Sequence, residues 1–227
     1  MLYVDSKIDK MSKEKEILNI IRKYALSDNV FFDKDSFKKW DYTPQFEQDA
    51  SNCWFYSMCN NAYYNLNWDF KLDDLIEVKN LMRDYGFNMK DWWFPVLAGA
   101  FIAKYLSEKR GVEVRLFQID FFKSTSKFSD LFKLWVVFGM NRINTPLLYT
   151  DAFDDGRVNQ VYYEYQATWH HATNICYDPD KKLLKELWTW GNSKNNQFYY
   201  DILQFWMNIK SWAISPLFTF FGILEDE

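Results

Sequence analysis

The stretch QDASNCWFYSMCNNAYY (48–64) places a small polar pair, Ser51-Asn52, directly before Cys53 and a long aromatic segment. Ser and Asn are preferred at the residue before a helix, and the apolar spacing that follows predicts a helix over 52–66. Cys53 would then lie in the first turn, where free N–H groups and the helix dipole favour the thiolate. Such a cysteine is either a small core residue or a nucleophile.

The composition favours a single domain whose core is rich in aromatic side chains. The chain has 227 residues, 21% of them aromatic, and a net charge of −4. No basic stripe persists along the sequence, which argues against a nucleic-acid partner. The longest apolar run, WWFPVLAGAFIA (92–103), is too short for a membrane span and predicts a buried helix. The charged N-terminus does not resemble a signal peptide.

The cysteines and histidines are few. Cys53, Cys59 and Cys176 form no C-x-x-C pair, and the only histidines are the adjacent His170 and His171. Three such cysteines predict neither a disulfide framework nor a metal site, so we expect no metal and no cofactor. Cys59 and Cys176 are expected to be buried thiols.

Hydrophobic periodicity predicts helices first and strands later. Helices are expected over 12–25, 52–66, 72–84, 91–108 and 126–138, and a strand over 112–119. From about residue 146 the pattern becomes strand-like, at 167–177, 183–190, 197–203 and 212–224. This order predicts an α+β domain with one core rather than a wound α/β sheet.

A strand through residues 167–177 sends His170 and His171 to opposite faces, and only one of them can meet Cys53. His171 shares its face with Thr173, whereas His170 shares its face with Ala172. Periodicity alone does not choose between the two histidines.

A family resemblance makes this choice. Asn52-Cys53-Trp54, then His171-Ala172, then WTWGN (188–192) resembles the papain superfamily of cysteine peptidases. The order is similar, more closely, to the Mac (IdeS-type) immunoglobulin G-cleaving cysteine endopeptidases, and 38–46 and 215–222 add to that likeness. The resemblance covers roughly 38–66 and 165–222. It implies a single papain-like domain over 1–227, in which the helix of Cys53 packs on a C-terminal antiparallel sheet. The implied parts are an N-terminal helical extension (1–37), a helical part with Cys53 (38–140) and a sheet part with His171 (141–227).

The resemblance also implies roles for single residues. Cys53 would be the nucleophile, and His171 the general base and later the acid. The family's Asp falls on Gly191 here, so Asn192 is the nearest residue that could orient the imidazole, although strict papain register would give Trp188. A Cys-His dyad without a third member remains an alternative.

The oxyanion donor departs from the papain pattern, because Glu47 occupies the position of its glutamine. An ionised carboxylate cannot donate a hydrogen bond. Gln48 and Gln45 are the two candidates, and the sequence does not rank them.

The expected function is therefore a cysteine endopeptidase that hydrolyses peptide bonds through a thiol mechanism. The resemblance implies a secreted protein that acts on an immunoglobulin or another host protein; without it, a cytoplasmic location is expected. Two alternatives stay open: a catalytically silent papain-like binding protein, and a Cys-His acyl transferase. The oligomeric state is not predicted.

Overall fold

The computed structural model describes residues 2–27, 34, 37, 46–67, 70–143, 149–152, 158–162, 171–189 and 198–224. Over these ranges the chain is an α+β protein with six helices and nine strands. The helices are α1 (Leu2–Tyr24), α2 (Cys53–Asn65), α3 (Leu72–Asp84), α4 (Pro95–Arg110), α5 (Thr125–Lys133) and α6 (Ile202–Lys210).

The strands join into one mixed sheet. They are β1 (Ala25–Ser27), β2 (Val114–Asp120), β3 (Phe138–Arg142), β4 (Tyr149–Ala152), β5 (Val158–Tyr162), β6 (His171–Asp178), β7 (Leu183–Leu187), β8 (Phe198–Tyr200) and β9 (Leu217–Ile223). Their order in the sheet is β1-β2-β9-β3-β6-β7-β8-β4-β5. Only the β1–β2 pair is parallel among these strands.

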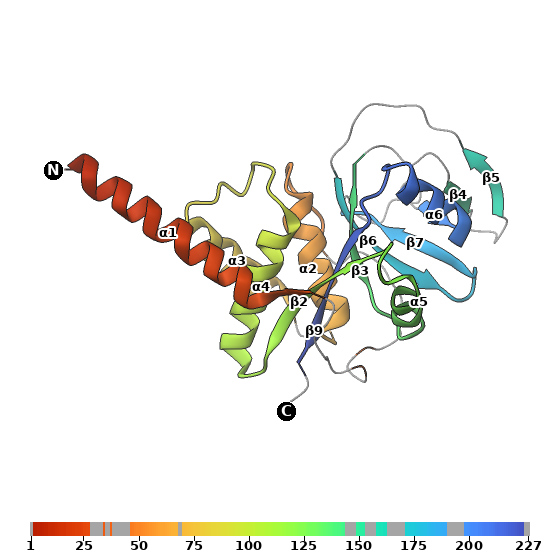
Figure 1. Cartoon of the computed structure of the whole chain (residues 1–227), viewed down its shortest axis with the longest axis horizontal. Coiled ribbons are helices and arrows are strands. Elements are labelled where there is room, and N and C mark those ends of the chain that lie inside the picture. Colours follow the sequence, from red (N-terminus) through yellow and green to blue (C-terminus); the bar gives the residue numbers. More distant parts are fainter. Residues whose placement is uncertain are drawn as a thin grey trace.

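Helices cover both faces of the sheet (Figure 1). Successive side chains of a strand point to opposite faces, and in β9 Phe221 belongs to one hydrophobic cluster and Phe220 to another. The first cluster lies between the sheet and helices α1 to α4, and the second lies between the sheet and helices α5 and α6. Cys53 belongs to the first cluster.

Several predicted elements are confirmed. The predicted helices over 52–66 and 72–84 correspond to α2 and α3, and the predicted strand over 112–119 corresponds to β2. The helix predicted over 12–25 extends back to Leu2. The helix predicted over 91–108 begins only at Pro95, because proline is favoured at the first helical position and disfavours a helical residue before it.

Other predicted boundaries are wrong. The helix predicted over 126–138 ends at Lys133, and β3 already begins at Phe138. The strand predicted over 197–203 stops at Tyr200, because Asp201 starts α6 with a capping box: its carboxylate accepts from the N–H of Gln204, whose side chain accepts from the N–H of Asp201. The strand predicted over 212–224 begins at Leu217, directly after Pro216.

The two halves of the chain share the sheet. Strand β2, from the helical half, pairs along its length with β9 near the C-terminus. The boundary predicted between residues 140 and 141 falls inside β3. The helix of Cys53 packs on β6 and β9, as the sequence predicts for the arrangement of helix and sheet.

Gly139 sets how closely α2 approaches the sheet. A Cβ atom at this position would lie 2.5 Å from Met58 Cε of α2 and 2.5 Å from Thr219 Oγ1 of β9. We expect Gly139→Ala to lower the free energy of unfolding by about 1–3 kcal/mol, because an added methyl group overpacks the contact. Urea denaturation measures the loss. Thr219→Ala, which removes one of the two opposing atoms, should restore part of it; an unchanged midpoint in Gly139→Ala would contradict this account of the contact.

Candidate active site

Cys53 lies in the first turn of α2, as the sequence predicts, and is its first residue. The side chain of Asn52, the residue before it, makes no capping hydrogen bond to the helix. Instead it bonds to the preceding turn: Asn52 Oδ1 accepts from the N–H of Ala50, and Asn52 Nδ2 donates to Asp49 Oδ1 at 2.6 Å. This short-range bonding competes with helix geometry and is typical of Asn in turns. The turn brings the chain into α2 with Cys53 at its N-terminal end.

Three buried asparagines fix α2 against the sheet. Asn65 Nδ2 donates to the carbonyl of Val137 at 2.7 Å, and Asn65 Oδ1 accepts from the N–H of Val137 at 2.9 Å. Asn61 donates to the same carbonyl and accepts from the N–H of Phe221 in β9. Asn174 of β6 donates to the carbonyl of Ser57. Because a buried polar group without its partner is costly, these bonds hold the helix in one register on β6.

The sulfur of Cys53 is buried against β6. The N–H of Ala172 lies 3.5 Å from Cys53 Sγ, and Cys53 is 4% exposed. Burial raises the pKa of the Cys53 thiol, although the N–H groups of Ala172, Trp54 and Cys53 itself oppose this by lowering it. A position in the first turn of a helix predicts the opposite, a lowered thiol pKa. Desolvation outweighs the helix amides here, so the thiol is neutral near pH 7.

His171 is the first residue of β6, directly before Ala172. Its ring centroid lies 5.0 Å from that of Trp188, and its cross-strand neighbour in β3 is Arg142. Burial, and then the positive charge of Arg142, lower the pKa of His171 to about 4. The imidazole is therefore neutral at physiological pH.

The two faces of β6 serve different neighbours. Ala172 and Asn174 meet α2, whereas Thr173 bonds to Glu186 and Ile175 packs in the cluster under α5 and α6. Alternation groups the side chain of His171 with the second set. Its ring contacts that of Trp188, and the backbone of the next residue touches Cys53.

Beside His171 lies a buried charge network that the sequence argument missed. Arg142 Nε is 3.1 Å from Glu186 Oε1, which also accepts from Thr173 Oγ1 at 2.9 Å. Tyr200 Oη donates to Glu186 Oε2 at 2.6 Å. The available signal was Glu186 in LLKELW (183–188): alternation puts this acidic residue on the same strand face as the apolar Leu184 and Trp188.

Aromatic rings enclose the guanidinium of this network. Arg142 Cζ lies 4.7 Å from the ring centroid of Trp188 and 4.7 Å from that of Phe198. The two rings are stacked on each other 5.1 Å apart. Arginine favours such planar stacking, which keeps its charge fixed beside the imidazole.

Gln48 is hydrogen-bonded to Thr189, a residue just beyond the end of β7. The N–H of Gln48 donates to the carbonyl of Thr189 at 2.8 Å, and the hydroxyl of Thr189 donates to Gln48 Oε1. The β6–β7 register pairs Asn174 with Leu187, and two residues further along it brings Ala172 opposite Thr189. Gln48 Nε2 donates to the carbonyl of Ala50 at 2.7 Å. An amide nitrogen carries two N–H groups, so this bond uses one of them.

The remaining predicted residues divide between described and undescribed parts of the chain. Gln45, His170 and Asn192 lie outside the described residues. Trp188, the residue that strict papain register puts in the third position, is the one that contacts the ring of His171.

The other two thiols are buried, as the sequence predicts. Cys59 and Cys176 are both 0% exposed, and burial raises the pKa of each. Over the described residues, no cluster of three or more His, Cys, Asp or Glu side chains could hold a metal ion. In the same part of the chain, no helix has the length and apolar character needed to cross a membrane.

The lowered pKa of His171 predicts a pH dependence of stability. The unfolded chain binds a proton near pH 6.5, whereas the folded chain binds it only near pH 4. The stability contribution is therefore present above pH 6.5 and lost as pH falls toward 4, by about 3 kcal/mol. His171→Asn should flatten this part of the urea-denaturation profile, and His170→Asn serves as the matched control. An equal slope in wild type and His171→Asn would show that this imidazole is not the group responsible.

No family model matches this chain and no curated protein matches it, so the candidate site rests on its own geometry and chemistry.

Proposed function

We propose that this chain is a papain-like cysteine endopeptidase, with Cys53 as nucleophile and His171 as general base. The observation that carries the proposal is the 3.5 Å approach of the N–H of Ala172 to Cys53 Sγ. It joins the N-terminus of a helix to the start of a strand 119 positions later.

The contact supports the proposal because it brings the backbone next to His171 close to the sulfur. Across one peptide bond the nitrogen of Ala172 lies ~2.4 Å from the Cα of His171, so that Cα is roughly 6 Å or less from Cys53 Sγ. An imidazole nitrogen extends several ångströms from its own Cα. The ring of His171 packs on Trp188, on the face of β6 that carries Thr173, so the proposal requires this ring to leave Trp188 and the start of β6 to turn toward the thiol.

The proposed hydrolysis starts from a neutral Cys53 thiol and a neutral His171 imidazole. The imidazole takes the thiol proton as Cys53 Sγ attacks the peptide carbonyl, and the tetrahedral oxyanion forms against the N–H of Cys53 and the free N–H of Gln48 Nε2. The intermediate expels the amine, which takes the proton from His171. Water then attacks the thioester with His171 as base, releasing the acid and restoring the thiol.

In the proposed mechanism the free enzyme holds a neutral Cys53 thiol and a neutral His171 imidazole, not a preformed thiolate–imidazolium ion pair. The pKa of Cys53 is raised and that of His171 is lowered, both first by burial. Proton transfer then accompanies attack rather than preceding it, and the acidic limb of activity is set by protonation of His171. We expect activity to persist in mild acid and to fall below about pH 4.

The substrate class is a protein, and an immunoglobulin is the first candidate because of the resemblance to the Mac (IdeS-type) endopeptidases. The test incubates the full chain with immunoglobulin G and, separately, with a degenerate peptide library, and identifies new N-termini by mass spectrometry. Cleavage by wild type and none by Cys53→Ala supports the proposal. Equal digestion by both proteins would trace the cleavage to a contaminant and overturn it.

The base assignment is tested separately with His171→Ala and its neighbour His170→Ala. Loss of cleavage in the first variant alone supports His171 as base. Loss in the second variant alone would move the base to His170 and leave Cys53 as nucleophile.

A second candidate function is a catalytically silent papain-like binding protein. It is favoured by one observation: the ring of His171 packs on Trp188 beside the buried charge of Arg142, which disfavours the imidazolium. If the library and immunoglobulin G are both left intact and Cys53 reacts no faster than Cys59, this candidate replaces the first.

A further inference from the structure

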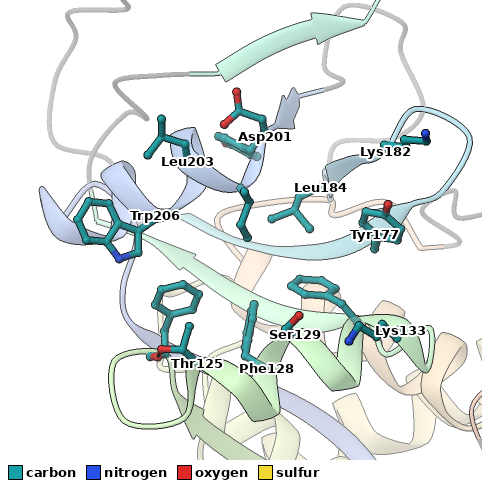
Figure 2. A pocket seen from close by; sticks show the side chains of 14 residues that line it. Thr125, Phe128, Ser129, Lys133, Tyr177, Lys182, Leu184, Asp201, Leu203 and Trp206 are labelled. Carbon is teal, nitrogen blue, oxygen red and sulfur yellow. Dashed lines mark hydrogen bonds between the residues drawn. The ribbon is translucent and has the colours of Figure 1, made fainter.

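A cavity of about 780 Å³ lies on the face of the sheet opposite α2 and Cys53. Helices α5 and α6 form two of its walls, and strands β7 and β8 contribute the third (Figure 2). Its lining is mainly apolar and aromatic, and includes Phe121, Phe128, Phe132, Leu184, Tyr200 and Trp206. This volume and lining match those of sites for small organic ligands.

Large apolar side chains remain exposed at this cavity. On α6, Ile202, Leu203 and Trp206 are 66%, 62% and 38% exposed, and all three line it. Apolar surface gathered around a hollow, rather than scattered singly, is typical of a binding site. The cavity therefore offers a ligand both an interior and an apolar rim.

The charges of the lining are unevenly placed. Lys133 and Lys182 lie at the same end of the cavity, with Tyr177 between them, and Trp206 lies at the opposite end (Figure 2). The lining also contains Asp201, but its carboxylate accepts from the N–H of Gln204 at 2.7 Å and caps α6. The lysine end thus offers positive charge to a ligand.

The two lysines are available to a ligand at little cost. Lys133 Nζ lies 3.2 Å from Asp130 Oδ1, but both side chains are more than 70% exposed, and such surface pairs contribute little to stability. Lys182 is exposed in the turn between β6 and β7, with a φ of +55°. Each side chain can reorient toward an anion without disturbing the core.

We propose that this cavity binds a long-chain monocarboxylate. The alkyl chain lies along the rings of α5 and α6, and the carboxylate lies between Lys133 and Lys182. The occupant is an acid rather than a neutral or cationic lipid because the polar end of the cavity is cationic. The proposal does not depend on the chemistry of Cys53, which lies on the other side of the sheet.

The test is isothermal titration of the full chain with dodecanoate below its micelle concentration, beside dodecyltrimethylammonium as the charge-inverted probe. We expect one site for dodecanoate and at least tenfold weaker binding of the cation. Affinity should rise about fourfold for each methylene from octanoate to dodecanoate, as burial of the chain predicts. Equal affinity for the two probes, or no binding of either, would overturn the proposal.

Three variants locate the site. Ser129→Trp, at an exposed lining position of α5, should fill the cavity and abolish binding without changing the core. The double charge reversal Lys133→Glu/Lys182→Glu should weaken dodecanoate at least tenfold, whereas Lys123→Glu, a reversal at an exposed lysine outside the lining, should leave it unchanged.

Two results would contradict the site. If dodecanoate binds Ser129→Trp as tightly as wild type, the acid binds elsewhere. The second result would come from sedimentation velocity of the ligand-free protein. If the wild type is a dimer and Ser129→Trp dissociates it, this surface binds a second copy of the chain and the proposal is overturned.

Discussion

Replacing Cys53 with alanine is expected to lower the rate of peptide cleavage by about 10⁴-fold or more, because removal of a nucleophile eliminates the covalent pathway. The variant should fold normally, since alanine occupies less space than cysteine at a position already packed against Ala172. Initial rates on the peptides identified for wild type, measured at equal protein concentration, give the size of the loss.

The matched control for this prediction is Cys59→Ala. Cys59 lies on the same helix and is fully buried, so its replacement also removes one sulfur from the core of α2. We expect it to keep wild-type cleavage rates and to lose only a modest amount of stability. Equal activity in Cys53→Ala and Cys59→Ala would contradict the assignment of Cys53 as nucleophile.

The second large effect concerns the charge network beside His171. Glu186→Gln is expected to lower the free energy of unfolding by about 3–5 kcal/mol, because it removes the buried carboxylate that lies 3.1 Å from the guanidinium of Arg142. The hydrogen bond from Tyr200 Oη, at 2.6 Å, also loses its charged acceptor. Urea denaturation at pH 7 measures the change.

A double variant separates the network's charge from its packing. Arg142→Met/Glu186→Gln removes both charges, so it should recover part of the loss seen in Glu186→Gln alone. The same double variant should raise the pKa of His171, since the positive charge of Arg142 is one cause of its depression. If Glu186→Gln unfolds at the same urea concentration as wild type, the network does not have the energetic role that we assign to it.

The sequence predicted the parts of the fold that local signals determine. The Ser51-Asn52 pair and the apolar spacing after it located α2 and put Cys53 in its first turn, as found. Helix α6 was missed because residues 197–203 combine β-favouring aromatics with Asp201, and the capping box of Asp201 with Gln204 is a weaker signal than the strand pattern.

The electrostatics of the site could not be predicted, because they depend on packing between distant segments. The helix N-terminus argues for a thiolate at Cys53, yet burial against Ala172 of β6 raises the thiol pKa. Arg142 and Glu186 are 44 residues apart in sequence and form a pair only because β3 and β7 flank β6. Long-range pairings of this kind have no local signature.

The choice between the two histidines shows the same limit. Alternation along a strand separates them but does not say which face meets α2. The structure answers for the described part of β6, where Ala172 and Asn174 meet the helix and Thr173 does not. Alternation gives the side chain of His171 to the opposite face, so its assignment as base rests on the contact between the next residue, Ala172, and Cys53 Sγ.

The most direct test of the central claim is the rate of iodoacetamide alkylation at Cys53, mapped by mass spectrometry from pH 4 to pH 10 in wild type and His171→Ala. If His171 serves Cys53 as base, the wild-type thiol reacts at neutral pH, well below its raised pKa. In that case it reacts far faster than Cys59 and Cys176, and its rate falls at least tenfold in His171→Ala. If Cys53 is as slow as those two buried thiols until the pH exceeds its own pKa, and His171→Ala changes nothing, then no catalytic pair exists and the chain is a binding scaffold.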